Sequence, residues 1–398
     1  MRTSVEREDR ELDLGDTRIA FSDRTDRELR EARLLFQVLG SPALSNIGQK
    51  TTLFALSIGL PVIGMIKRTI FKQFCGGETI EESLRTAERL ATSNIGTILD
   101  HSVEGQESED LLDGTVEEII RTIQVAQTRK DVPFCVFKPS GIGRMQILEK
   151  VSQGSTLDAA QREEWDHVEK RVDRLCAAAY TAGIPILIDA EESWIQQAID
   201  DLIGKMMQRY NQQRVIVFNT IQFYRHDRLA FLKESLERSK RDGYHLGVKL
   251  VRGAYMEKER ERAKQKGYPS PIHPDKKSVD RDYDEALKIC IEHIDRMAIV
   301  AGSHNEHSSI LLTQLINAQR LSHNDPRIYF SQLLGMSDNI SYNLAASGYN
   351  VMKYVPYGPV QKVIPYLIRR AAENTSVAGQ TSRELQMIRE ELMRRKIG

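Results

Sequence analysis

Two arginines and a glutamate near the C-terminal end of the chain have the residue types and spacing of an amino-acid binding site. Arg369 and Glu373 lie four residues apart, so on a helix they would share one face, with Arg370 beside them. Two guanidinium groups can bind one carboxylate through paired hydrogen bonds, and a glutamate can accept a hydrogen bond from an ammonium group. A site for an amino-acid headgroup is one interpretation of this pattern, and a surface ion pair of little energetic consequence is the other.

Further polar residues lie at the C-terminal ends of a series of short apolar runs. They are Asp100, His101, Lys138, Asp189, Glu191, Glu192, Asn219, Gln222, Lys249, Arg252, Ser303, His304, Asn305, Gln332 and Tyr354. Charged side chains are rarely buried without a partner. If the apolar runs are strands of one sheet, a ring of such residues around one opening is better explained by a bound ligand than by packing.

The apolar runs predict eight strands of a parallel sheet in an α/β fold. Each run is rich in β-branched or aromatic residues and lacks strict alternation, as expected for strands buried on both faces. They cover residues 95–99, 134–137, 184–188, 215–218, 246–251, 298–301, 328–330 and 351–355. Helical spacing, as in Trp165, Val168 and Val172, fills the segments between them. Eight β/α units fit a (β/α)8 TIM-type barrel, whose chemistry lies at the C-terminal ends of the strands, although periodicity alone also allows a doubly wound open sheet.

A helical segment is predicted before the barrel. Residues 26–39 have an amphipathic pattern, and Thr79 followed by Glu82 is typical of a capping box at the start of a helix. We therefore expect two parts, an N-terminal helical arm of residues 1–93 and a barrel of residues 94–398.

The composition is that of an ordinary globular protein. Of its 398 residues, 40% are hydrophobic and 28% are charged. The 56 basic residues balance the 56 acidic ones, so the protein has no net positive charge that would attract nucleic acid. The cysteines Cys75, Cys135, Cys176 and Cys290 are far apart, which argues against a disulfide framework or a zinc site. The charged N-terminal residues lack the apolar core of a secretory signal, so we expect a cytoplasmic protein.

The most apolar stretch, residues 53–66, is too short and too interrupted by glycine and proline to span a membrane. A buried helix is expected there, with contact to a membrane surface as the alternative. Gly141 and Gly143 begin a dinucleotide-binding pattern but lack its third glycine, so a nicotinamide site is not expected. His304 and His307 have no clear third ligand, so no metal is expected.

Four motifs, in this order along the chain, resemble those of flavin-dependent proline dehydrogenases, the proline oxidase family. They are Ile188-Asp-Ala-Glu-Glu192, Lys249-Leu-Val-Arg-Gly-Ala-Tyr255, Leu333-Leu-Gly-Met336 and Tyr366-Leu-Ile-Arg-Arg-Ala-Ala-Glu-Asn374. The similarity extends from about residue 90 to about residue 375, and the chain looks more like the stand-alone, monofunctional enzymes than the barrel of the bifunctional bacterial ones.

The resemblance implies a role for each matching position. The expected catalytic residues are Asp189 and Lys249. The expected substrate-binding residues are Lys138, Leu333, Tyr354, Arg369, Arg370 and Glu373. The expected FAD-binding residues are Ala190, Gln222, Lys249, Arg252, Gly253, Ala254, Tyr255, Ser303 and His304. In this scheme the arginine pair and Lys138 hold the substrate carboxylate, Glu373 holds its amine, Tyr354 packs over its ring, and Lys249 lies near N5 of the flavin.

The resemblance also implies a reaction. L-Proline would transfer a hydride from C5 to N5 of non-covalently bound FAD and become Δ1-pyrroline-5-carboxylate, the first step of proline catabolism, with the electrons passing to a quinone. The protein would supply orientation and positive charge around the cofactor. A quinone acceptor implies at least transient peripheral contact with the inner membrane, for which residues 53–70 are the candidate surface. No residue stands out as a base for the amine.

Two departures from the family pattern have consequences. Pro365 directly precedes the last motif, so the helix is expected to begin late or to kink there. Lys249 stands where arginine also occurs, which offers flavin N5 a point charge in place of a planar fork. Three rivals stay open: a hydroxyproline dehydrogenase of the same fold, which the bulk of Tyr354 disfavours, a non-catalytic amino-acid sensor, and a phosphate-handling barrel.

Overall fold

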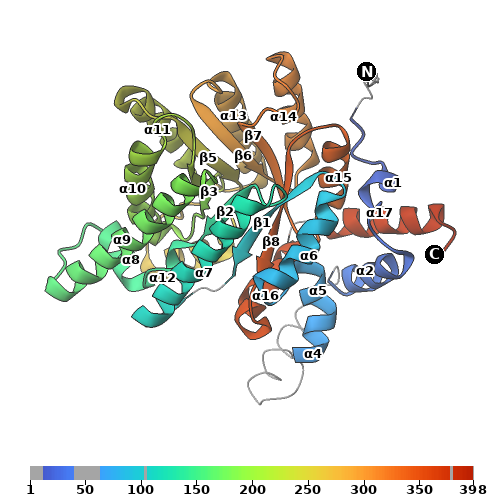
Figure 1. Ribbon diagram of the computed structural model, residues 1–398, viewed down its shortest axis with the longest axis horizontal. Coiled ribbons are helices and arrows are strands. Elements are labelled where there is room, and N and C mark those ends of the chain that lie inside the picture. The colour runs from blue at the N-terminus through green and yellow to red at the C-terminus, as the bar shows by residue number, and fades with distance from the viewer. Residues whose placement is uncertain (1–11, 40–62, 103–104, 377–379, 398) are drawn as a thin grey trace.

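Eight parallel strands form a closed barrel in the computed structural model, which describes residues 12–39, 63–102, 105–376 and 380–397 (Figure 1). The strands are β1 (Ile95–His101), β2 (Phe134–Phe137), β3 (Ile186–Ile188), β4 (Val217–Gln222), β5 (Leu246–Val251), β6 (Met297–Gly302), β7 (Ile328–Leu333) and β8 (Val351–Tyr357). Strand β1 pairs with β8 along its whole length, from Ile95 beside Val351 to His101 beside Tyr357. The predicted TIM-type barrel and its eight strands are therefore confirmed, and the open sheet is wrong.

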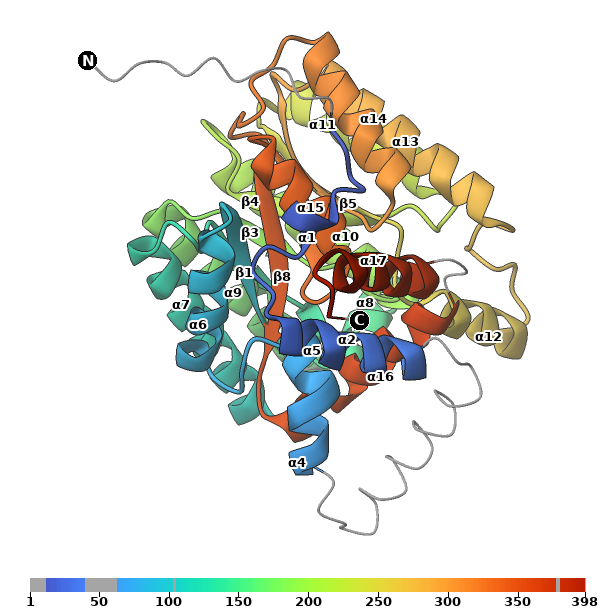
Figure 2. The same cartoon turned by 90° about the vertical axis from the view of Figure 1, so that its right-hand side faces the viewer.

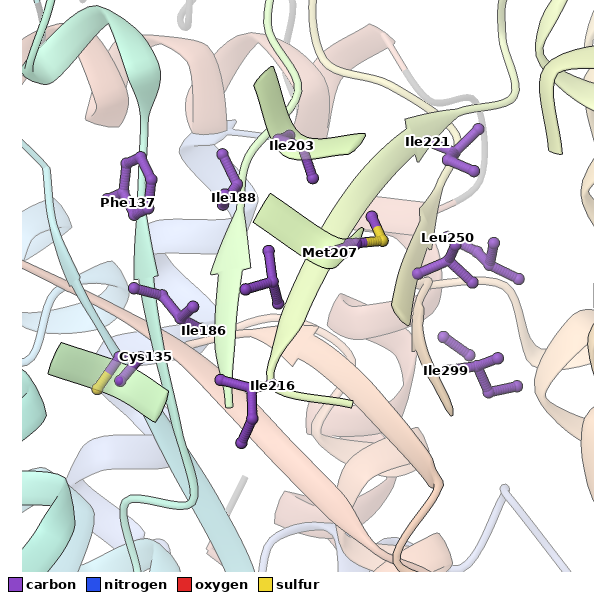
Figure 3. Close-up of a cluster of buried hydrophobic side chains, with 14 of the residues drawn as sticks. Cys135, Phe137, Ile186, Ile188, Ile203, Met207, Ile216, Ile221, Leu250 and Ile299 are labelled. Carbon is purple, nitrogen blue, oxygen red and sulfur yellow. The ribbon is translucent and has the colours of Figure 1, made fainter. Parts of the chain in front are cut away.

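The strands are buried on both faces, which explains why their sequences lack alternation. Ile98, Phe134 and Val136 belong to a cluster inside the barrel. The intervening side chains point outward and pack against the helices. Figure 3 shows part of this layer, which includes Ile186 and Ile188 of β3 and Met207 of helix α10 (Ser193–Tyr210). The strand side chains in both layers are apolar, because neither face of the strands meets solvent.

Helices connect the strands and surround the barrel (Figures 1 and 2). They are α7 (Glu109–Thr128), α8 (Met145–Ser152), α9 (Ala159–Ala182), α10 (Ser193–Tyr210), α11 (Arg228–Asp242), α12 (Met256–Lys266), α13 (Lys276–Glu292), α14 (Glu306–Ala318), α15 (Asp338–Ala346) and α16 (Val360–Ser376). Trp165, Val168 and Val172 of α9 are buried, as their spacing predicts. Helix α16 runs through Pro365, so the expectation of a late start is wrong.

The N-terminal residues form helices that pack beside the C-terminal ones. They are α1 (Thr17–Ala20), α2 (Asp26–Leu39), α4 (Ile63–Ile66), α5 (Lys72–Phe74), α6 (Ile80–Ala91) and the π-helix η1 (Lys67–Phe71). The bounds of α2 match the prediction, and the Thr79 side chain accepts the Glu82 backbone N–H at the start of α6. Phe36 of α2 and Phe74 of α5 share a buried cluster with Leu367 of α16 and the final helix, α17 (Gln380–Arg394) (Figure 2).

The apolar stretch of residues 53–66 lies largely outside the described residues, and only its last four residues are seen, as helix α4. Ile66 is buried there. Among the described residues, no helix combines the length and the apolar character needed to cross a membrane.

Candidate active site

A cavity of about 580 Å³ lies at the C-terminal ends of the barrel strands. Every expected site residue whose side chain the structure describes lines it. Those residues are Lys138, Asp189, Ala190, Gln222, Lys249, Arg252, Gly253, Ala254, Tyr255, Ser303, His304, Leu333, Tyr354, Arg369 and Arg370. The backbone of Glu373 belongs to α16, but its side chain is outside the described part of the chain. The positions of these residues are thus established, while their individual roles stay predictions.

A buried carboxylate organises one end of the cavity. Asp189 follows β3 and accepts hydrogen bonds from Lys138 Nζ at 2.8 Å, Lys249 Nζ at 2.5 Å and the Tyr354 hydroxyl at 2.5 Å. Burial by itself would raise the pKa of Asp189, but the charges of Lys138 and Lys249 outweigh burial and hold this pKa well below its usual value. Asp189 therefore stays ionised at neutral pH and holds both ammonium groups in place.

Tyr354 of β8 connects the two lysines. The Lys249 Nζ atom lies 4.7 Å from the centre of the Tyr354 ring, and the Lys138 Nζ atom lies 5.5 Å from it. Such cation–π contacts help to hold the ring beside both ammonium groups. Burial, and then the carboxylates of Asp100 and Asp189, raise the pKa of Tyr354 well above its usual value, so its hydroxyl remains a donor.

The arginine pair reaches the same cavity from helix α16. Arg370 is buried, and its guanidinium carbon lies 5.2 Å from the centre of the Tyr366 ring. Arg369 and Arg370 both line the cavity, which favours the first interpretation of their spacing, while the alternative of an ion pair with Glu373 concerns a side chain outside the described part of the chain. Helix α16 follows the last strand, and this is why its side chains reach the mouth of the barrel.

The opposite part of the cavity is lined by hydrogen-bonded polar groups. Arg252 donates to Asp280 at 2.7 Å, to Ser303 Oγ at 2.7 Å and to Ser308 Oγ at 2.9 Å. Its guanidinium also lies 4.3 Å from the centre of the Tyr283 ring. Four contacts on one side chain leave Arg252 little rotational freedom, so its charge has a fixed place in the cavity wall.

Gly253 has a conformation that other residues rarely adopt. Its φ is +126°, and a Cβ atom at this position would lie 2.5 Å from the ring of Tyr224. Only glycine fits this close approach, which brings the backbone of residues 252–255 to the cavity.

His304 is a neutral member of the cavity wall. Burial, and then the charges of Lys353, Arg370 and Arg252, lower the pKa of His304 to about 3. Its Nδ1 atom is hydrogen-bonded to Ser337 Oγ at 2.9 Å. No group of three metal-ligating side chains occurs in the described ranges, and His304 is engaged with a hydroxyl.

Several of the polar residues after the strands do not reach the cavity. Asn219 donates to Asp200 at 2.9 Å on the helix side of the sheet, and Glu191 accepts the Ser140 backbone N–H at 2.7 Å. His101 and Glu192 are also absent from the lining. The polar residues at the strand ends thus predict at which end of the barrel the cavity lies, but they do not predict which of these side chains point into it.

Other lining residues gave no signal in the sequence. Arg383 and Glu384 of α17 belong to the cavity wall, as do Ser337 and Asn339 at the start of α15. Helix α17 lies beyond the last recognisable motif, and only its packing against the barrel brings Glu384 to the site.

Comparisons with known proteins agree with this geometry. The family model for proline dehydrogenase matches residues 83–383. The carbapenem antibiotics biosynthesis protein CarD of Pectobacterium carotovorum subsp. carotovorum is 36% identical over 325 residues, which cover 82% of this chain and 84% of that protein. Proline dehydrogenase 1, mitochondrial, of Dictyostelium discoideum is 33% identical over 430 residues, which cover 96% of this chain and 75% of that protein.

A solved structure supports the fold. Proline utilization A (PutA) from Bdellovibrio bacteriovorus, inactivated by N-propargylglycine, matches with a TM-score of 0.72 at 19% identity. The match covers 95% of this chain and 41% of that one, so the chain spans about two fifths of that longer protein and shares its barrel. With a family model matched over most of its length, this chain belongs to the proline dehydrogenase family.

Proposed function

We propose that the protein oxidises L-proline to Δ1-pyrroline-5-carboxylate with non-covalently bound FAD as the hydride acceptor and passes the electrons on to a quinone. The observation that carries this proposal is the charge of the cavity. Its lining contains seven basic residues and four acidic ones, although the whole chain is neutral. A cavity with excess positive charge suits two anionic groups, a substrate carboxylate and a cofactor pyrophosphate.

The residues present fit FAD in size and chemistry. A volume of about 580 Å³ falls within the range of roughly 300–1,000 Å³ typical of small-molecule and cofactor sites. Arg252, Ser303 and the neutral His304 would contact the cofactor phosphates, and the backbone after Arg252 would approach the ring system because Gly253 leaves no side chain in the way. Ala190, Gln222, Ala254 and Tyr255 complete this part of the wall.

The substrate would bind at the end organised by Asp189. Arg369 and Arg370 offer paired donors to its carboxylate, and Lys138 adds a third cation that Asp189 already holds at 2.8 Å. Tyr354 and Leu333 would bound the pyrrolidine ring, and Glu373 is the proposed partner of the amine. These contacts would fix the direction in which C5 of the substrate faces.

Lys249 would lie beside the reacting atoms. When bound, FAD supplies the two-electron acceptor for the hydrogen that leaves C5 of proline with its bonding electrons. The amine must be unprotonated at this moment, because its lone pair becomes the new C5=N bond. The Lys249 ammonium group, held by Asp189 at 2.5 Å, is oriented before the substrate arrives and would stabilise negative charge developing nearby. Neither lysine needs to lose its proton in this scheme.

The experiment is an absorption spectrum of the purified protein before and after L-proline is added without oxygen. A flavin band near about 450 nm that bleaches with L-proline, and not with other amino acids, is the expected result. A yellow protein that does not bleach would refute the substrate, and a colourless protein that cannot be reconstituted with FAD would refute the cofactor. Reoxidation of the bleached protein by a soluble quinone tests the acceptor.

Location belongs to the same proposal. We propose a cytoplasmic protein that contacts the inner membrane peripherally when it delivers electrons to a quinone. Binding to lipid vesicles that increases when the flavin is reduced would support this contact, and equal binding in both states would count against it.

A further inference from the structure

The turn that follows β7 has an unusual backbone. Gly335 has a φ of +74°, and Ser337 has a φ of +50° although it carries a side chain. A non-glycine residue in the left-handed region is strained, and it persists there only where the surrounding structure holds it. The turn lines the cavity through Leu333, Met336 and Ser337, so whatever holds this backbone also shapes the site.

Ser337 precedes helix α15 but does not cap it in the usual way. A serine at this position ordinarily accepts a backbone N–H of the first helical turn through its hydroxyl. Here the side chain makes no capping hydrogen bond, and its hydroxyl is hydrogen-bonded to His304 at 2.9 Å. The backbone N–H of Ser337 donates instead to Glu384 Oε1 of helix α17. Glu384 thus satisfies the backbone of the turn from outside, while the serine hydroxyl faces His304.

Glu384 is itself buried among charges from other elements. The groups that face it are Asp338 of α15, Lys353 of β8 and Arg24 of the N-terminal part. Asp338 is paired with Lys353 at 2.8 Å and with Arg24 at 3.1 Å, so these three form a closed cluster beneath the turn. Lys353 also donates to the Met336 carbonyl at 2.6 Å.

We propose that Glu384 is a positioning residue of the active site, which holds Ser337 in its left-handed conformation and through its hydroxyl orients His304 toward the bound cofactor. This inference rests on the proposed function for the identity of the cofactor. It makes α17 part of the active site, although α17 follows the last motif of the family pattern. The chain of contacts is short: Glu384 to the Ser337 N–H, and the Ser337 hydroxyl to His304.

The cluster also predicts a pH dependence. Burial, and then the charge of Asp338, raise the pKa of Glu384 to about 7. A carboxyl group with a raised pKa in the folded protein favours its protonated form, so its contribution to stability falls as the pH rises from the ordinary value of 4.5 through about 7. An anionic cofactor in the same cavity favours the protonated form further, so FAD affinity should be constant in acid and fall as the pH rises above about 7. His304 is neutral throughout this range.

The test compares Glu384→Ala and Glu384→Gln with a matched control, Glu390→Gln, on the same helix. Glu390 is half-buried, and among the described residues it accepts a hydrogen bond only from Gln386, at 2.8 Å. Hydrogen exchange of the peptide covering residues 334–340, measured without FAD, reports how well the backbone amides of the turn are protected. Titration of the FAD-free protein with FAD, followed by flavin fluorescence, gives the affinity of the site for the cofactor.

We expect Glu384→Ala to speed exchange in this peptide and to weaken FAD binding about tenfold, because the Ser337 N–H loses its acceptor. Glu384→Gln keeps an acceptor oxygen, so it should retain protection and affinity at about pH 6 and abolish the pH dependence. Unchanged exchange in Glu384→Ala overturns the inference. Faster exchange with unchanged FAD affinity also overturns it, since the turn would then not position the site. If wild-type protein binds no FAD, the proposed cofactor fails, and the exchange result still decides whether Glu384 holds the turn.

Discussion

Replacement of Asp189 by asparagine tests the central electrostatic argument. Asp189 accepts hydrogen bonds from two ammonium groups and one hydroxyl at 2.5–2.8 Å while only 8% of its surface is exposed. Asparagine has nearly the same shape, but it brings no charge and places an amide NH2 group where one lysine now donates. The ammonium groups of buried Lys249 and half-buried Lys138 then lose their common carboxylate and share one neutral oxygen, although Lys138 also lies 3.5 Å from the carboxylate of Asp100. Removing one partner of a buried ion pair costs about 3–5 kcal/mol of unfolding free energy, and we expect this loss for Asp189→Asn.

The assay is urea unfolding of FAD-free protein near pH 7, with Asp201→Asn as the matched control. Asp201 is exposed and accepts only from Gln197 at 2.9 Å within the described residues, so its replacement should change the unfolding free energy by less than about 0.5 kcal/mol. A loss below about 1 kcal/mol for Asp189→Asn would refute the argument that this carboxylate holds the lysines.

The pH dependence of that difference has a defined sign. The pKa of Asp189 is lowered in the folded protein, so its stabilising contribution is fully present above the ordinary value of 3.8 and is lost as the pH falls through the lower folded value. The difference between wild type and Asp189→Asn should therefore stay constant from about pH 7 to about pH 5 and shrink only in stronger acid. Proline oxidation should also fall about 100-fold, since both lysines lose their orientation.

Three further predictions concern the substrate end and the backbone of the site. Arg370→Lys should raise KM for L-proline about tenfold or more with a smaller effect on kcat, because lysine cannot make paired hydrogen bonds to a carboxylate; steady-state kinetics with an unchanged KM would contradict this role. Gly253→Ala should destabilise the protein by more than about 1 kcal/mol in thermal unfolding, because Gly253 has a φ of +126° and a Cβ atom there would lie 2.5 Å from the Tyr224 ring. The control is Gly204→Ala within α10, where the atom nearest to an added Cβ is 3.7 Å away. In the same assay it should stabilise the protein by about 0.5–1 kcal/mol. Wild-type protein should oxidise trans-4-hydroxyproline with a much lower kcat/KM than L-proline, and Tyr354→Ala should bring the two kcat/KM values closer together. Comparable wild-type kcat/KM values for both substrates would show that the buried tyrosine does not exclude the hydroxyl group.

The strands and the order of the site motifs were predictable because they depend on local pattern. Apolar runs such as Phe134–Phe137 are buried on both faces wherever they occur in a closed parallel barrel, so their composition identifies them without knowledge of their neighbours. Asp189 directly follows the run that forms β3, and Lys249 lies near the C-terminal end of the run that forms β5, so the pattern places both at one rim of the barrel. A late start of the helix at Pro365, one of the two expected outcomes, is wrong: a proline lowers local helix stability, but packing of Leu367 and its neighbours keeps the helix continuous.

What the sequence determined by itself is the fold class, the strand positions and the set of residues near the strand ends, since these follow from the burial periodicity of each segment. Which of those residues face one another was decided by tertiary structure alone. Lys353 and Tyr354 are neighbours in the same strand, yet the tyrosine points into the cavity and the lysine is buried outside the barrel beneath a turn, because side chains alternate across a sheet. Glu384 carries no local signal at all. It reaches the site only because α17 packs against the N-terminal helices and the barrel, a contact between segments far apart in the chain that no pattern within either segment specifies.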